Sequence, residues 1–308
     1  MARRRHYAPE QDLVHVSFKC VGDAFLMRPD AYTSFVIASA LAGAAEKYGV
    51  RIHAFGILSS HGHLELGIRG CRLDSFMQHF KSRTAMELNA HRGRDGAFFK
   101  QRYRCEPILS EEAAVGIELY VHAQAVSHEL VERAIEWPGL SSYAAVSEGR
   151  ASVEVSWFDD EAWREAGAKR SERQSFVHVA SVPLTPLPHR AGMSESALSA
   201  ERRALVARMK EVELEVSRKR RSEGARRLPR ASRYTSEDPN GMPSRDREKT
   251  PQPYAHGSEA EVRAYREAYA EVMVAYERAS ARYRESGRLC PFPAGTYPPR
   301  IAIARDVL

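Results

Sequence analysis

Two histidines separated by one residue, His61 and His63, lie beside a run of apolar residues that has the character of a strand. Side chains two positions apart in a strand point to the same face, so the two imidazoles can converge on one point. Further along, Tyr120 precedes Gln124 by four residues on an expected helix, where such positions are neighbours. Two imidazoles and an amide oxygen can hold a divalent cation, and a phenol beside them can attack a phosphodiester.

Each of these pairs is weak when taken alone. Two histidines on one strand face are more often packed or surface residues than metal ligands. Many helices carry a tyrosine and a glutamine at this spacing. The chemical interpretation therefore depends on the elements that would bring the two pairs together.

The hydrophobic patterning predicts those elements. Alternation of apolar and polar residues predicts strands, which cover residues 13–21, 51–58, 63–68 and 102–109. Asp30 and Gly49 bound a first helix, and Asp74 can cap a second one. Ser110, followed by two glutamates, starts the helix of Tyr120. This β-α-β-β-α-β order is compatible with an α+β, ferredoxin-like sheet covered by helices on one face.

A family resemblance joins these elements. The stretch Gly96–Arg104 resembles the Gly-x-aromatic/Leu-Trp-Gln-x-Arg-Tyr stretch of REP-associated tyrosine transposases. These proteins belong to the insertion-sequence-200-like, single-tyrosine branch of the HUH nucleases. That family has a His-hydrophobic-His strand upstream, and a helix with the catalytic tyrosine and a Trp-Pro-x-Ser-Ser-Tyr element downstream. Residues 61–63, 116–126 and 137–143 are similar to these in the same order, so the resemblance covers about residues 10–150.

The resemblance implies a ferredoxin-like HUH nuclease domain that acts on single-stranded DNA with hairpin elements. The implied reaction is a transesterification, in which Tyr120 attacks phosphorus and becomes joined to the 5′ end of the cut strand. His61, His63 and Gln124 are the implied ligands of Mg²⁺ or Mn²⁺. DNA contacts are expected from four residues near the middle of the domain: Lys100, Arg102, Tyr103 and Arg104.

The clearest departure from the family is Gly62, which stands where a bulky apolar residue is usual. Loss of that side chain would leave the two histidines less firmly positioned and weaken metal binding. If Phe18 or Phe55 already fills the space beneath this position, the glycine is compensated, and a larger residue at position 62 would overpack and destabilise the strand. The family also has Pro-Asn where this chain has Ser59 and Ser60.

Two other classes of function stay open at this point. One is a non-catalytic DNA- or RNA-binding protein of the same fold, a decayed or domesticated transposase. The other is a zinc-stabilised module that uses His61, His63 and Cys71, although this spacing is not a recognised zinc pattern. Covalent trapping of cut DNA separates the enzyme from both.

The amino-acid composition limits the kinds of partner and compartment that we expect. The formal net charge of the 308-residue chain is +6, which suits a polyanionic partner such as nucleic acid. The four cysteines are scattered, which favours reduced thiols and a cytoplasmic, nucleoid-associated protein. No apolar stretch approaches the length needed to cross a membrane, and no P-loop is present. The sequence does not decide between a monomer and a homodimer.

The composition shifts near residue 160, so we expect three segments. Residues 1–155 form the HUH transposase domain. Residues 156–257 hold a Pro-marked linker, a helix ending in the basic cluster 218–221, and a segment from about 222 to 257 that is expected to be disordered. Residues 258–308 begin with a capping box and a helix, whose tyrosines favour a packing face over a base-stacking platform, and end in a Pro-rich tail.

Overall fold

A computed structural model describes residues 13–100, 102–224, 253–286, 290–294 and 296. The basic N-terminal residues, most of the segment expected to be disordered and most of the Pro-rich tail lie outside the described residues. Within the described ranges no helix is long and apolar enough to cross a membrane.

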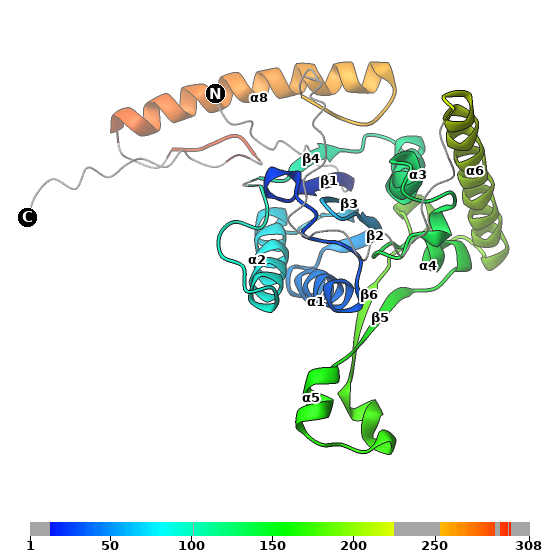
Figure 1. The fold of residues 1–308 in the computed structure, drawn as a ribbon. Coiled ribbons are helices and arrows are strands. Elements are labelled where there is room, and N and C mark those ends of the chain that lie inside the picture. Colours follow the sequence, from blue (N-terminus) through cyan, green and yellow to red (C-terminus); the bar gives the residue numbers. More distant parts are fainter. Residues whose placement is uncertain (1–12, 101, 225–252, 287–289, 295, 297–308) are drawn as a thin grey trace, which may run out of the picture.

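A four-stranded antiparallel sheet forms the centre of the molecule (Figure 1). The strands occur in the spatial order β2-β3-β1-β4, and their bounds are Leu13–Lys19 (β1), Arg51–Ile57 (β2), His61–Gly67 (β3) and Arg104–Pro107 (β4). With helix α1 (Ala31–Tyr48) between β1 and β2 and helix α2 (Leu73–His91) between β3 and β4, this is the predicted ferredoxin-like arrangement. The fold prediction is confirmed.

Helices α1 (Ala31–Tyr48) and α2 (Leu73–His91) cover one face of the sheet (Figure 1). The predicted cap of α1 is present, because the Asp30 carboxylate accepts a hydrogen bond from the Thr33 backbone N–H, and Gly49 ends the helix with a left-handed backbone. The N-cap of α2 is Arg72, so the prediction of Asp74 as the cap was wrong. Asp74 lies in the first turn instead, where its negative charge favours the helix dipole.

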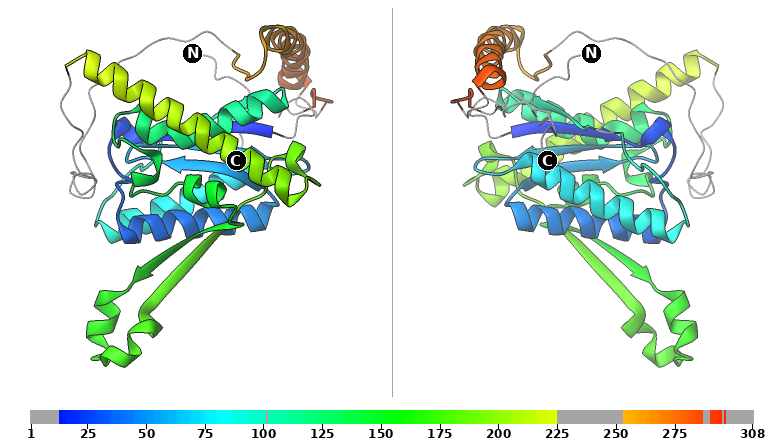
Figure 2. Two further views of the ribbon diagram at one scale, coloured as in Figure 1. Left: turned by 90° about the vertical axis from the view of Figure 1, so that its right-hand side faces the viewer. Right: turned by 90° about the vertical axis from the view of Figure 1, so that its left-hand side faces the viewer.

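The opposite face of the sheet is covered by helix α3 (Glu111–Ser127). Its N-cap is Ser110, as predicted. The long helix α6 (Glu195–Ser222) packs across α3 through Leu205 and Met209 and crosses the molecule diagonally (Figure 2). At the end of α6, Arg220 is buried and paired with Glu132, so this member of the basic cluster is not a free cation.

A strand pair that the sequence reasoning missed extends away from the sheet (Figure 1). Strands β5 (Ser152–Phe158) and β6 (Val177–Pro183) are antiparallel, and their tip carries α5 (Asp160–Glu165) and the 3₁₀ segment η3 (Arg170–Phe176). Both strands of this pair pack on α1, and the Trp157 ring near the tip end of β5 lies 4.7 Å from that of Tyr32. The other short elements are η1 (Val21–Asp23), η2 (Ala134–Glu136), α4 (Tyr143–Glu148) and η4 (Pro188–Arg190).

The last helix, α8 (Glu259–Ser286), lies beyond the β4 edge of the sheet (Figure 1). The capping box is confirmed, because Ser258 and Glu261 each accept a hydrogen bond from the other's backbone N–H. Tyr276 is buried, and the rings of Tyr276 and Tyr283 lie 5.5 and 6.0 Å from the Phe292 ring, so these two tyrosines of α8 pack against the chain that follows the helix. Just before α8, His256 forms two backbone hydrogen bonds with the strand region of Pro107 and Leu109.

Candidate active site

The side chains that face α3 form a polar row across the middle of the sheet. Strand pairing sets Ser17 of β1 opposite both His63 of β3 and Arg104 of β4, and sets His15 opposite Glu65 and Glu106. Because the side-chain period of a strand is two, these residues share the face away from α1 and α2. The expected strand 63–68 in fact begins at His61, and the expected strand 102–109 is shorter at both ends.

The two histidines of the His-x-His pair lie together at the start of β3, with ring centroids 5.4 Å apart. Burial lowers the pKa of His61 to about 4 and that of His63 to about 2, and neighbouring histidines add to both effects. Both rings are therefore neutral at physiological pH, which is the form that binds metals. The Ser60 hydroxyl lies 3.1 Å from His61 Nδ1.

Gln124 enters the same space from α3. Its side chain is buried, and its Nε2 donates a hydrogen bond to the Tyr120 carbonyl at 3.1 Å. Its Oε1 has no partner among the described residues, although a buried acceptor without a donor costs about 1–3 kcal/mol. The amide also raises the pKa of His61 against the effect of burial, which places it beside that imidazole.

Tyr120 lies one turn earlier on α3 and is 46% exposed. Its ring stands edge-on to that of His63, at 5.4 Å, and to that of His15, at 5.6 Å. The structure thus brings the predicted nucleophile and the three predicted metal ligands to one place. An exposed phenol beside buried ligands can meet a substrate that arrives from solvent.

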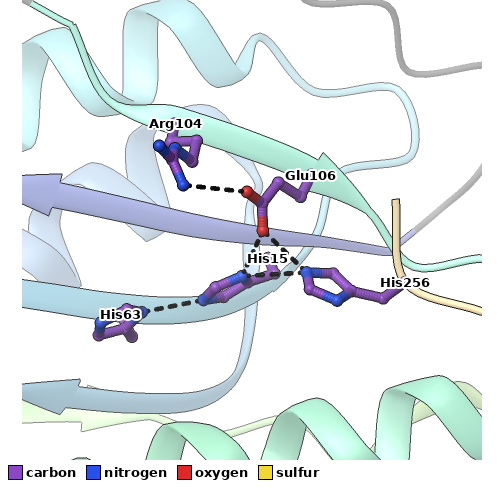
Figure 3. A network of polar contacts seen from close by, with 5 residues as sticks. All are labelled: His15, His63, Arg104, Glu106 and His256. Carbon is purple, nitrogen blue, oxygen red and sulfur yellow. Dashed lines mark hydrogen bonds and ion pairs between the residues drawn. The ribbon is translucent and has the colours of Figure 1, made fainter. Parts of the chain in front are cut away.

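His63 is held by a chain of polar contacts that sequence reasoning missed (Figure 3). His15 Nε2 lies 3.0 Å from His63 Nδ1, and His15 Nδ1 lies 3.2 Å from Glu106 Oε2. A carboxylate only accepts, so His15 Nδ1 donates and His15 Nε2 accepts the proton of His63 Nδ1. The Nε2 lone pair of His63 is then free for a metal. A hydrogen bond from the other ring nitrogen commonly orients a metal-binding histidine in this way.

Glu106 is ionised at the end of this chain. Burial alone would raise its pKa, but hydrogen bonds from His15 and His256 outweigh that effect and hold the pKa below its ordinary value. Burial lowers the pKa of His15, against the hydrogen bond to Glu106. His15 could have been found from strand alternation, whereas His256 lies in a stretch with no such pattern.

The predicted DNA contacts lie at and beyond the β4 edge. The Lys100 ammonium pairs with Asp23 at 2.9 Å. The Arg104 guanidinium lies over the Tyr254 ring and 3.8 Å from Glu106. Arg102 is exposed, and Tyr103 is half-buried against the core.

The alternative zinc module is not formed. The Cys71 thiol donates to the Gly49 carbonyl, beyond the end of β3 opposite to His61. Within the described ranges, only His15, Glu106 and His256 bring three metal-binding His, Cys, Asp or Glu side chains together.

The Trp-Pro-Gly-Leu-Ser-Ser-Tyr element is structural. The Trp137 indole N–H donates to the Ile57 carbonyl, and Ser142 bonds to both backbone groups of Phe55. The same hydroxyl contacts His122 of α3 at 2.9 Å. The element therefore pairs with β2 at the edge of the sheet and links α3 to that strand.

Glu118, two residues before Tyr120 on α3, belongs to a buried ion pair. Two nitrogens of Arg190 donate to the two oxygens of Glu118, each at 2.7 Å. Glu65 is buried nearby, and burial first, then the Glu118 charge, raises its pKa well above the ordinary value. These surroundings favour the protonated form of Glu65 over a second buried negative charge beside Glu118.

Comparison with known proteins supports the family resemblance over part of the chain. Residues 30–124 match the family model described as transposase IS200 like, a range that includes the His-x-His pair, Tyr120 and Gln124. The family resemblance seen in the sequence is thus confirmed over these residues. No curated protein matches the chain.

Two solved structures are similar to this chain. One is a REP-associated tyrosine transposase bound to a REP hairpin, with 16% identity, 48% of this chain and 87% of that chain covered, and a TM-score of 0.42. The other is a putative transposase from Deinococcus radiodurans R1, with 17% identity, 40% and 98% covered, and a TM-score of 0.28.

Proposed function

We propose that this protein is a single-strand DNA endonuclease and strand transferase that uses Tyr120 as its nucleophile. The observation that carries the proposal is the convergence of four groups. An exposed phenol stands against His63, and the unpartnered oxygen of Gln124 lies beside His61. The proposal rests on this geometry together with the family match over residues 30–124.

The site fits a divalent cation. His61 and His63 are neutral, Nε2 of His63 is free when its Nδ1 donates to His15, and Gln124 places a buried amide oxygen beside His61. Nitrogen and amide ligands suit Mn²⁺, and Mg²⁺ would retain several waters. A bound cation would neutralise a non-bridging phosphate oxygen and orient the scissile group.

The protein's own residues account for the covalent step. The Tyr120 oxygen attacks phosphorus, the bond to the 3′ oxygen breaks, and the phosphate stays joined to Tyr120 at the 5′ end of the cut strand. The phenol loses its proton and the departing 3′ oxygen gains one. The phosphodiester energy is conserved, so a second 3′-OH can reverse the step without ATP.

We assign substrate binding to the β4 edge. Arg102 and Arg104 are exposed cations there, and Tyr103 offers an aromatic ring close to them. Cations bind phosphates regardless of sequence, and rings stack on unpaired bases, so this edge suits single-stranded DNA beside a hairpin. Lys100 would have to exchange Asp23 for a phosphate.

The test is covalent capture of cut DNA. A single-stranded hairpin oligonucleotide is incubated with the full chain and Mn²⁺, with a label on either the 5′ or the 3′ end. We expect a protein adduct that survives denaturing gels and carries only the 3′-end label, together with a released strand that ends in 3′-OH. Tyr120→Phe should bind the DNA and form no adduct.

The matched control is Tyr48→Phe, because Tyr48 lies on α1, on the far side of the sheet. This variant should form the adduct as the unmodified protein does. An adduct of equal yield in Tyr120→Phe, or none in the unmodified protein with any hairpin DNA tried, would favour the non-catalytic binding protein. The structure gives that alternative no special support, since the space beneath Gly62 is filled.

A further inference from the structure

A second group of converging side chains lies on the other side of His15 from the His-x-His pair. His15 Nδ1, Glu106 Oε2 and His256 Nε2 are mutually 3.2, 2.9 and 3.3 Å apart (Figure 3). We propose that these three side chains form a second divalent-metal site, of the kind that binds Zn²⁺, separate from His61, His63 and Gln124.

The spacing of the three atoms carries the proposal. The point equidistant from them is about 1.8 Å from each, and ligand distances for zinc are about 2.0–2.2 Å. An ion that sits slightly out of their plane would thus meet all three at ordinary distances without movement of the backbone. Two histidines and one glutamate form a known zinc ligand set, which leaves a fourth position for water.

The surroundings hold these ligands in place. His15 and Glu106 are buried on adjacent strands, and the other Glu106 oxygen is 3.8 Å from Arg104. The His256 backbone is fixed by hydrogen bonds of 2.9 and 2.7 Å to Pro107 and Leu109. The His256 side chain is 30% exposed, so solvent can reach the group from that side.

His15 and Glu106 lie on strands of the central sheet, whereas His256 lies in the C-terminal segment, so the site would join these two parts of the chain. Residues 253–286 touch the sheet through this region, and Tyr254 lies over the Arg104 guanidinium. A bound ion would therefore fasten the C-terminal segment to the edge that we assign to DNA.

The shared histidine couples the two sites through one proton. To bind a metal, His15 Nδ1 must lose its proton, and neutral His15 then carries it on Nε2. That nitrogen would donate to His63 Nδ1, 3.0 Å away, and neutral His63 would carry its own proton on Nε2. His63 could then no longer bind a metal through Nε2, so occupation of one site opposes occupation of the other.

The test measures Zn²⁺ in a background that lacks the first site. Full-length His61→Ala protein is dialysed against Zn²⁺, and bound zinc is measured by elemental analysis and by competition with a chromophoric chelator. We expect one Zn²⁺ per chain. Adding His256→Ala, or the nearly isosteric Glu106→Gln, should weaken binding by about tenfold or more, because losing even an outer partner of a metal ligand has that effect.

Adding His178→Ala instead is the matched control, since His178 is an exposed histidine on β6. It should leave zinc binding unchanged. Thermal unfolding of every variant checks that the fold persists. Equal zinc affinity with and without His256 and Glu106 would overturn the site, whatever the outcome for Tyr120. Two tightly bound Zn²⁺ in the unmodified chain would overturn the shared-proton coupling.

Discussion

Gly62 offers a quantitative test of how the His-x-His strand is packed. Phe18 of β1 is its direct cross-strand partner. A Cβ placed on Gly62 would lie 2.4 Å from Phe18 Cζ and 2.8 Å from Ile57 Cδ1. The Phe18 ring thus occupies the space that a bulky residue at position 62 would need, an arrangement known as aromatic rescue of a strand glycine.

Gly62→Val should therefore destabilise the protein. Phe18 is 1% exposed and stacks edge-on against Phe80 and Phe99, so it cannot move aside without disturbing the core. Overpacking of this kind costs about 1–3 kcal/mol, more than the roughly 0.5–1 kcal/mol gained by replacing a strand glycine. At about 2–4 °C per kcal/mol, the melting temperature should fall by several degrees. Mn²⁺ affinity should fall with it, because both histidines flank the displaced residue.

A double-mutant cycle isolates the contact. In a Phe18→Leu background the space is partly open, so Gly62→Val should be neutral or stabilising there, with a coupling energy of about 1–3 kcal/mol. Gly43→Ala on α1 is the control, since nothing lies within 4 Å of its added Cβ and the change should stabilise. Urea unfolding supplies the free energies. If Gly62→Val stabilised the protein with Phe18 intact, or if the coupling were near zero, this reasoning would be refuted.

Three further predictions concern charge and metal. Burial lowers the pKa of His61 and of His122 to about 4, so the unfolded chain binds more protons than the folded chain between about pH 6.5 and pH 4. The free energy of unfolding should therefore fall as the pH drops through that window, and urea unfolding at several pH values measures it. Arg190→Met should lower the free energy of unfolding by about 3–5 kcal/mol, because it leaves Glu118 buried without its partner. Combining it with Glu118→Leu should recover most of that stability in thermal melts. Equal stability of the single and double variants would count against this. EDTA should abolish DNA cleavage, and cleavage at an unchanged rate in excess EDTA would exclude the metal role. Gln124→Ala should weaken Mn²⁺ binding, measured by calorimetry, without lowering the melting temperature.

The parts of the fold that depend on local pattern were predictable from the sequence. Strand alternation, the Asp30 and Ser110 caps and the Gly49 terminus predict the β-α-β-β-α-β order, and the spacing of His61 with His63 predicts a shared face. The β5–β6 pair was missed although both strands alternate, because 18 residues separate them and suggest no hairpin turn.

The rest of the site depends on contacts between distant residues. The register that sets Phe18 opposite Gly62 joins positions in separate strands, and sequence alone left two outcomes open. His256 contacts Glu106, 150 positions away in the sequence, because two backbone hydrogen bonds hold it beside β4. No hydrophobic periodicity predicts such a contact. The strand of His15 was predicted, but its link to His63 required the sheet order.

The central claim is that Tyr120 becomes covalently joined to DNA, and peptide mapping tests it most directly. The adduct from the hairpin oligonucleotide is digested with protease and nuclease, and the modified peptide is sequenced by mass spectrometry. We predict a nucleotide attached through a 5′ phosphodiester to the peptide that contains Tyr120, within α3. A nucleotide on any other residue, with Tyr120 unmodified, would contradict the account.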